Sequence, residues 1–219
     1  MACEIDLMKD YPRSARDVVA RGAEKTEEDR RIARRFGREF FDGERRHGYG
    51  GFEYHPRFWE PVIPAFQKHF ALTGESSVLD GGCAKGFMLY DLSRMIPGIH
   101  VAGIDVSSYA IENAKEEVRA FVKVGDVREM PFESDSVDVV FSINTLHNLE
   151  LQDLERALRE IERVQRRGSF ITVDAYRNDA EQERMNAWNL TAKTVLHVDG
   201  WKNLFTKVGY TGDYYWFIA

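Results

Sequence analysis

The stretch Val78–Gly86, VLDGGCAKG, joins an apolar run to an acidic residue and a glycine-rich turn, and the helical pattern FMLYDLSRM follows it directly. The apolar residues before Asp80 predict a short buried strand. The small residues after it let the backbone approach a ligand closely, and the start of the next helix adds hydrogen-bond donors. This strand–turn–helix unit indicates both the fold and the place of the ligand.

Strands and helices alternate through the chain on the C-terminal side of this unit. The predicted strands are 77–82, 100–107, 120–127, 136–144 and 169–176, and the helical patterns between them are 84–95, 108–118 and 151–164. Continuous apolar strands separated by helices are typical of a parallel sheet that is covered on both faces. We therefore predict an α/β fold with a doubly wound, mostly parallel sheet, whose ligand lies at the carboxyl ends of the strands.

The chain before residue 76 differs in composition. Residues 1–48 are dense in charge, and four apolar side chains within them fall at helical spacing, which predicts one amphipathic helix. These side chains are Ile32, Phe36, Phe40 and Phe41. The segment that follows at 49–61, YGGFEYHPRFWEP, places large rings among glycines and prolines. We predict that it forms a lid over the strand ends. The alternative, which we favour for Phe58 and Trp59, is that the rings form core beneath the N-terminal helix.

The chain is thus predicted to have two parts. Residues 1–75 form an N-terminal helical segment and aromatic lid, and residues 76–219 form the catalytic domain. Tyr49 and Tyr54 are the lid residues that we expect to contact the bound ligand.

Composition disfavours several classes of function. The 219 residues carry 30 Lys and Arg against 36 Asp and Glu, a net charge of −6, which disfavours a nucleic-acid partner. No apolar run is long enough for a membrane span, and the charged N-terminus does not resemble a signal peptide. The two cysteines and the other candidate ligands lack the spacing of a disulfide framework or a metal site. We expect a soluble, reduced, cytoplasmic globular protein.

The spacing of the glycines tests which ligand the turn accepts. A dinucleotide fingerprint needs three glycines at offsets of zero, two and five, and Gly81, Gly82 and Gly86 do not satisfy that spacing. A triphosphate loop needs Lys and then Ser or Thr after its last glycine, but Lys85 precedes Gly86. Neither phosphate-binding motif is therefore present.

The remaining pattern is Asp80 followed by Gly82, Ala84 and Gly86 at alternate positions. It resembles the first motif of class I S-adenosylmethionine-dependent methyltransferases, D/E-x-G-x-G-x-G. Ala84 stands where that motif has its middle glycine, which adds one methyl group. The resemblance covers roughly residues 76–175 and implies S-adenosylmethionine as the cofactor.

Later positions strengthen the resemblance and imply further cofactor contacts. Asp105, followed by Val106, ends the second predicted strand, where the family has an acidic residue that accepts the ribose hydroxyls. Asp126 follows the third strand, where the family's acidic residue receives the adenine amino group, and Val127 is placed for a backbone contact to the ring. The segment 130–149 also resembles the family's approach to its fourth strand.

Three residues near the expected methyl group are candidate catalytic residues. Asn144 follows the fourth strand and is expected to face the ligand. His147 is a hypothetical general base, because an unperturbed imidazole titrates near neutrality, and its alternative role is to start a helix. Tyr176 ends the fifth strand, as a partner for the sulfonium or as an ordinary rim residue.

The resemblance implies methyl transfer to O or N of a small polar metabolite. An alternative is an enzyme that consumes the same cofactor without methylating, such as an azetidine-2-carboxylate synthase, which releases methylthioadenosine. A non-catalytic partner and an enzyme that modifies protein or nucleic acid are less consistent with the three acidic residues and the net charge. Only 213–219 is predicted as a strand at the C-terminal end, so the sheet either lacks an edge strand or pairs that edge across a homodimer.

Overall fold

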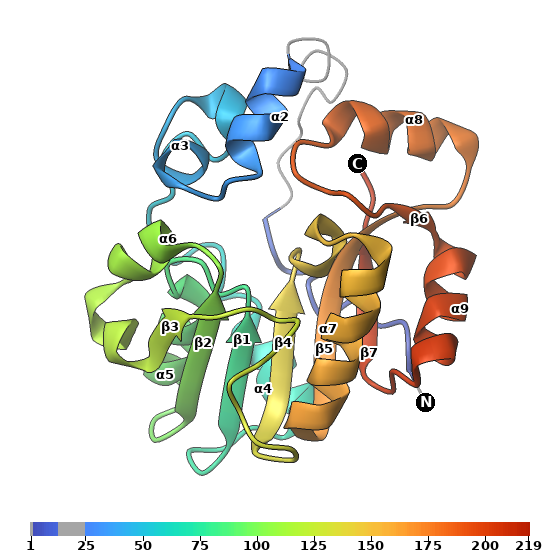
Figure 1. Cartoon of the computed structure of the whole chain (residues 1–219). Helices are drawn as coiled ribbons and strands as arrows, with labels where there is room; N and C mark the ends of the chain where they lie inside the picture. Colours follow the sequence, from blue (N-terminus) through green and yellow to red (C-terminus); the bar gives the residue numbers. More distant parts are fainter. Residues whose placement is uncertain (1, 13–24) are drawn as a thin grey trace.

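The computed structural model describes residues 2–12 and 25–219. Seven parallel strands form one sheet in the order β3-β2-β1-β4-β5-β6, and β7 also pairs with β5 (Figure 1). The strands are β1 (Ser77–Gly81), β2 (His100–Asp105), β3 (Val122–Val124), β4 (Val137–Ile143), β5 (Gln165–Tyr176), β6 (Leu196–His197) and β7 (Asp213–Phe217). The predicted doubly wound, mostly parallel sheet is confirmed.

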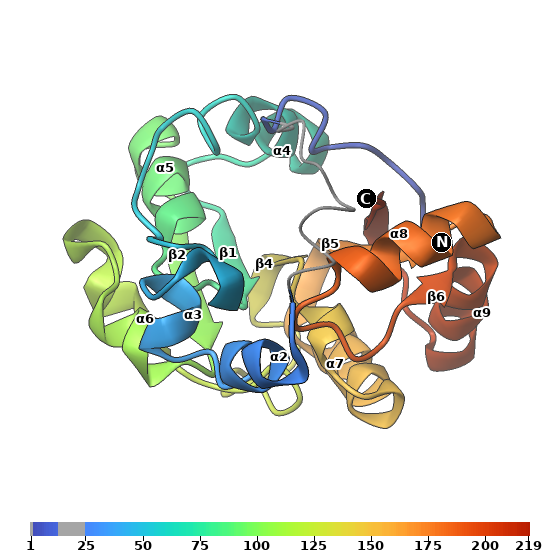
Figure 2. The same cartoon turned by 90° about the horizontal axis from the view of Figure 1, so that it is seen from above.

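Helices cover both faces of the sheet because alternate strand residues point to opposite sides. Val78 packs on one face with residues of α4 and α5, and Leu79 packs on the other with residues of α7 and α9 (Figure 2). The covering helices are α4 (Ile63–Phe70), α5 (Phe87–Met95), α7 (Leu151–Val164) and α9 (Val198–Val208). In α7 the buried residues recur every three or four positions, so the helix presents one apolar stripe to the sheet.

Shorter elements connect these layers and surround the carboxyl ends of the strands. They are α2 (Glu27–Ala33), α3 (Arg38–Phe41), η1 (Arg45–His47), α6 (Ser108–Glu112), η2 (Glu116–Phe121), η3 (Leu146–Asn148) and α8 (Asp179–Trp188). In Figure 1 the α2–α3 segment and α8 lie at that end of the sheet, where the predicted ligand site is. Among the described residues, no helix combines the length and the apolar character needed to cross a membrane.

The N-terminal segment departs from the single amphipathic helix that its apolar spacing predicts. Phe36 adopts a left-handed backbone with φ of 50°, and Gly37 then precedes α3, so the helix is broken into α2 and α3. The break lets the backbone oxygen of Phe36 accept a hydrogen bond from the Ser107 hydroxyl. A tertiary contact thus overrides the local pattern.

Helix α4 belongs to the same core as the sheet, although it precedes residue 76. Ile63 and Phe66 are fully buried, and the Phe66 ring stacks on Phe141 of β4 with centroids 4.5 Å apart. The division at residue 75 therefore does not coincide with a break in packing. It stays a prediction about function.

The exposed edge of β7 is covered by the chain's own N-terminal segment. Tyr214 donates its N–H to the oxygen of Cys3 and accepts the N–H of Ile5, both at 3.0 Å. These bonds use backbone groups that an uncovered edge strand offers to another chain. The sequence predicts that the sheet either lacks an edge strand or pairs that edge across a homodimer. In the structure the edge is instead paired within the chain.

We predict that Ile5→Pro uncovers this edge, because proline removes the N–H that Tyr214 accepts. The free energy of unfolding should fall by about 1–3 kcal/mol, and light scattering should detect self-association. Glu4→Pro is the matched control, since neither of these two bonds uses the N–H of Glu4. Equal behaviour of the two variants would show that the edge is not protected by this bond.

Candidate cofactor-binding and active site

The turn after β1 is built from left-handed backbone and close contacts. Gly82 has φ of 96°, and a Cβ at this position would lie 2.1 Å from Oγ1 of Thr145. The N–H groups of Gly82 and Cys83 donate to the oxygen of Ile104, at 2.8 and 3.0 Å. Gly86, with φ of 74°, is the N-cap of α5. The two glycines therefore allow a conformation and an approach that a larger residue would obstruct.

Ala84 differs from the glycine of the motif in the cost of its backbone conformation as well as in its methyl group. Its φ of 48° is left-handed, a conformation that costs a residue with a Cβ about 1–2 kcal/mol. Its N–H donates to Oδ2 of Asp105 at 2.8 Å. This charge-assisted bond helps to hold the alanine in the conformation that the middle glycine of the motif would adopt freely.

Asp105, at the carboxyl end of β2, has both of its oxygens oriented by backbone donors. Oδ2 accepts from Ala84 and Oδ1 accepts from the N–H of Ser107 at 2.8 Å. Burial raises the pKa of this carboxyl, and these hydrogen bonds oppose the shift. Each oxygen retains a further lone pair for a ligand hydroxyl. The adjacent Val106 side chain is 53% exposed, an apolar surface beside this polar group.

Asp80, at the end of β1, is only 5% exposed. Among the described residues no side chain or backbone group donates a hydrogen bond to its carboxyl. Burial, with a smaller contribution from Asp105, raises its pKa to about 8. Two carboxyls thus converge on neighbouring strand ends. This arrangement favours a cationic ligand, which would stabilise the ionised form of Asp80.

Asp126 has a different environment, because Arg128 occupies its carboxylate. Nε of Arg128 lies 3.0 and 2.9 Å from the two oxygens, and Nη2 lies 2.6 Å from Oδ2. The hydrogen bonds from Arg128 are the main reason that the pKa of Asp126 is lowered. An adenine amino group would have to share this carboxylate with Arg128. The neighbouring Val127 is buried, and its Cγ1 lies 3.1 Å from where a Cβ of Gly81 would be. The adenine role of both residues stays a prediction.

Asn144 is held at the end of β4 by Thr172 of β5. Its N–H donates to the Thr172 hydroxyl at 2.9 Å, and that hydroxyl donates to the Asn144 side-chain oxygen, also at 2.9 Å. The backbone of Asn144 is left-handed, with φ of 53°. Among the described residues nothing accepts from its side-chain NH₂ group. The amide is thus oriented as a donor, as expected of a residue that faces a ligand.

His147 lies in the protein interior. Nδ1 accepts the N–H of Asp174 at 3.1 Å, and burial lowers the pKa of the imidazole although Asp174 opposes the shift. In a neutral ring whose Nδ1 accepts, the proton is on Nε2. Neither nitrogen then has a free lone pair. This geometry argues against the general-base hypothesis and gives His147 a structural role between η3 and β5.

The three tyrosines named from the sequence lie in different places. Tyr176 ends β5, and its ring packs edge-on against His197. Tyr54 donates to Asp91 of α5 at 2.8 Å, and the Lys115 ammonium lies 5.0 Å from its ring centroid, so it packs against the scaffold. Tyr49 packs among lid rings, with its centroid 4.3 Å from that of Phe52. The cofactor contacts expected of Tyr49 and Tyr54 stay predictions, and for Tyr54 the bond to Asp91 argues against one.

The lid is joined to the glycine turn by a buried lysine. Lys85 is 7% exposed, and its ammonium lies 2.9 and 2.7 Å from the two oxygens of Asp42 and 2.9 Å from the oxygen of Phe52. Tyr109 of α6 donates to Asp42 at 2.7 Å. Burial opposes ionisation of Asp42, but the bonds from Lys85, Phe52 and Tyr109 outweigh it and lower the pKa of this carboxyl. We call Asp42, Lys85 and Tyr109 the lid junction.

The sequence did not reveal the lid junction or the two threonines. The position of Lys85 before Gly86 excludes a triphosphate loop, and the only sequence signal for another role is its charge inside a turn of small residues. Asp42 lies 43 positions away in a charge-dense segment, where nothing distinguishes it from its neighbours. Thr145 and Thr172 become important only because the sheet places them beside Gly82 and Asn144. No group of three potential metal ligands occurs in residues 2–12 and 25–219.

Comparisons with known proteins agree with this geometry. Residues 79–173 match the family model described as a methyltransferase domain. The chain is 28% identical over 126 residues to the malonyl-[acyl-carrier protein] O-methyltransferase of Legionella pneumophila, covering 56% of this chain and 43% of the relative. It is 27% identical over 146 residues to methyltransferase GfsG of Streptomyces halstedii, covering 60% of this chain and 51% of the relative.

Residues 79–173 therefore match a methyltransferase domain, in agreement with the resemblance to class I S-adenosylmethionine-dependent methyltransferases. The YcgJ protein of Bacillus subtilis has the same fold, with a TM-score of 0.54, 19% identity and coverage of 67% of this chain and 66% of that one. The chain spans about half of the length of the two curated relatives, so their substrates do not transfer to it. S-adenosylmethionine is the methyl donor of the family, and the residues present fit it: two carboxyls for a cationic ligand, hydroxyl acceptors on Asp105 and an apolar surface at Val106.

We expect Lys85→Met to release the lid from the glycine turn, because Asp42 and Phe52 lose their ammonium partner. Breaking a buried ion pair costs about 3 kcal/mol, so amide exchange across residues 37–54 should accelerate at least about tenfold. Lys207→Met, at an exposed ion pair with Glu155, is the matched control. Unchanged exchange in Lys85→Met would mean that the ring contacts alone dock the lid.

We expect Asp80→Asn to raise the stability of the cofactor-free protein and to weaken cofactor binding. The unfolded carboxyl ionises near pH 4 and the folded one near pH 8, so the free energy of unfolding contributed by Asp80 falls as pH rises between these values. The amide does not ionise. The cofactor-free variant should therefore be more stable than the wild type by more than about 1 kcal/mol at pH 8, and similar to it at pH 4.

Calorimetry should show that Asp80→Asn weakens binding of S-adenosylmethionine. Binding to the wild type near pH 7 should release a proton that the variant does not release. The difference in the free energy of unfolding between variant and wild type should be larger at pH 8 than at pH 4. An equal difference at both pH values would contradict the raised pKa of Asp80.

Proposed function

We propose that this enzyme transfers a methyl group from S-adenosylmethionine to O or N of a small polar acceptor. The observation that carries the proposal is the pair of carboxyls at the ends of β1 and β2, one of them unpartnered, beside a glycine turn to which a lid is docked. That pair suits a cationic donor, and the docked lid suits a reaction that must exclude water. The net charge of −6 supports a small acceptor rather than a nucleic acid.

Bound S-adenosylmethionine supplies an activated methyl group, so the protein's main task is alignment. Asp105 and Asp80 hold and orient the donor on the sheet edge. The Asn144 amide, fixed by Thr172, offers its NH₂ group beside them. Tyr176, at the end of the adjacent β5, is a candidate contact for the acceptor or the sulfonium.

We propose that the described part of residues 1–75 has two roles. Helix α4 is part of the scaffold, because its side chains lie in the core. Residues 25–61 form the lid over the strand ends. At its start, Lys25 donates to the backbone oxygen of Trp188 at the end of α8, so α8 forms the opposite wall. A site enclosed in this way supports a small acceptor.

One observation favours the non-methylating alternative, in which the enzyme cyclises the methionyl chain as azetidine-2-carboxylate synthases do. His147 has no free lone pair, so neither of its nitrogens serves as a base for an acceptor, whereas a cyclisation requires mainly positioning groups such as Asn144. The [4+2]-cyclase SpnF has the same fold, with a TM-score of 0.54 at 20% identity over 69% of this chain and 58% of that one. SpnF is a cyclase, and at this identity the likeness concerns the fold alone.

The by-product separates the two functions. We expect that incubation with S-adenosylmethionine and a metabolite extract yields S-adenosylhomocysteine, measured by mass spectrometry. Methylthioadenosine formed from the cofactor alone would instead establish the alternative. Asn144→Ala should lower turnover about 10²-fold in either case, while His147→Ala, assayed below its own melting temperature, should leave the pH dependence of turnover unchanged. A pH profile lost only in His147→Ala would restore the general-base hypothesis.

A further inference from the structure

Helix α2 of the lid is fixed at both ends to elements around the site. Just before it, Lys25 contacts Trp188, with its ammonium 5.4 Å from the centroid of the indole ring. Just after it, the backbone oxygen of Phe36 accepts from Ser107, whose own N–H orients Asp105. The helix therefore crosses from the end of α8 to the β2 turn, and in Figure 2 it lies on the α7 side of the sheet.

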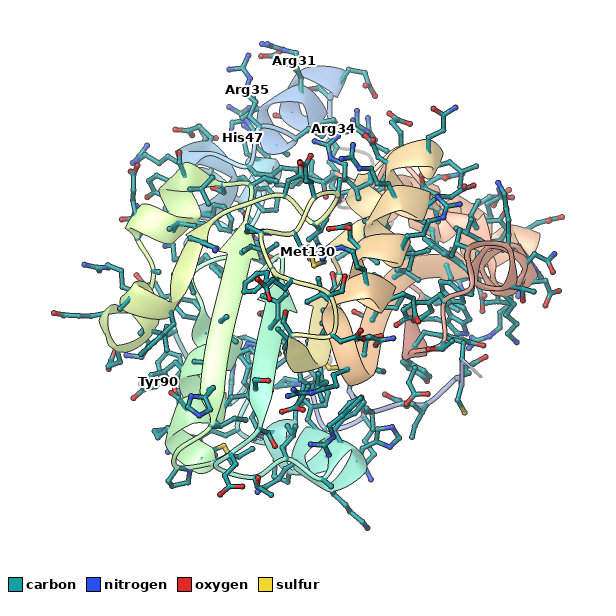
Figure 3. The ribbon with its side chains drawn as sticks, turned by 60° about the horizontal axis from the view of Figure 1, so that its bottom comes forward. Arg31, Arg34, Arg35, His47, Tyr90 and Met130 are labelled. Atoms are coloured by element: carbon teal, nitrogen blue, oxygen red, sulfur yellow. The ribbon has the colours of Figure 1, made fainter. Side chains whose placement is uncertain are left out.

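Arg34, the C-cap of α2, is half-buried and has no partner for its side chain. Its Nε is completely enclosed and makes no hydrogen bond, and no ion pair to its guanidinium occurs in the described parts of the chain. The arginines before it are paired: Arg30 with Glu27 at 2.6 Å and Arg31 with Glu28 at 2.5 Å. In Figure 3, Arg31 and Arg35 point away from the molecule, whereas Arg34 lies on the side of α2 nearest α7.

Apart from Asp80, whose carboxyl has no partner among the described residues, the acidic side chains of the strand ends and the lid already have cationic or hydrogen-bonding partners. Arg128 binds both Asp126 and Asp153, Lys85 binds Asp42, and Asp29 accepts from Thr26 and contacts His47. Leaving the enclosed Nε of a charged group without a partner is unfavourable. A second enclosed polar atom without a partner, Oδ1 of Asn148, lies on η3 just before α7. Helix α2 therefore has an unused cationic donor, and η3 has an unused acceptor.

We propose that Arg34 binds a carboxylate, or a similar oxyanion, of a ligand held beneath α2. This rests on the proposed function, because the ligand is either the cofactor, through the carboxylate of its methionyl end, or an anionic acceptor. A guanidinium matches a carboxylate in geometry as well as charge, with two parallel N–H···O bonds. The acceptor class under the second source is a small metabolite that carries a negative charge.

The test compares Arg34→Met with Arg31→Met, which removes a paired and outward-pointing arginine of the same helix. Calorimetry with S-adenosylhomocysteine, which has the carboxylate, and with methylthioadenosine, which lacks it, identifies the cofactor as the source. If the cofactor supplies the anion, Arg34→Met lowers affinity for S-adenosylhomocysteine about ten- to a hundredfold and leaves methylthioadenosine binding unchanged. Arg34→Lys should recover part of the loss.

If the acceptor supplies the anion, Arg34→Met binds both compounds normally and loses turnover only with the anionic fraction of a metabolite extract. Equal loss for both compounds, equal effects in Arg31→Met, or wild-type behaviour of Arg34→Met in all measurements would overturn the proposal. Melting temperatures of the cofactor-free variants exclude simple unfolding. Failure of the proposed function would be visible in the wild type itself, as no binding of S-adenosylhomocysteine.

Discussion

The hydrogen bond from the Ala84 N–H to the Asp105 carboxylate joins the two strand ends that make the site. It holds the turn after β1 in a left-handed conformation that alanine adopts only at a cost. The same turn meets η3 through the contact between Gly82 and Thr145, and meets the lid through Lys85. One short turn therefore aligns the cofactor loops, the loop after β4 and the lid. A change of its backbone would disturb all three.

Electrostatics divide the acidic residues of the site into two groups. Asp42, Asp126 and Asp153 have cationic partners from the chain, so their charges are balanced within the protein. Asp80 and Asp105 lie together without a cation, and burial raises the pKa of each. Stability lost at such a pair is recovered when a cationic ligand binds. Arg34 is the converse case, a cation without an anion, on the lid that crosses the same site.

The sheet also places the polar candidates in different environments. Asn144 is oriented by a threonine of the neighbouring strand and keeps its NH₂ group available. His147, three positions later, is turned into the interior and bonded through Nδ1. Residues so close in sequence have different environments because the chain passes from the end of β4 into η3, where Leu146 and His147 are buried.

The sequence alone determined the parallel sheet, the glycine turn and the positions of Asp80, Asp105 and Asn144. Apolar periodicity and strand-end position are local properties, and the carboxyl ends of parallel strands meet at one edge by geometry. Tertiary structure decided the rest. The break at Phe36, the cover over β7, the lid junction and the isolation of Arg34 all depend on contacts between distant segments. No local pattern encodes such a contact, because burial and partner choice are fixed only when the whole chain has packed.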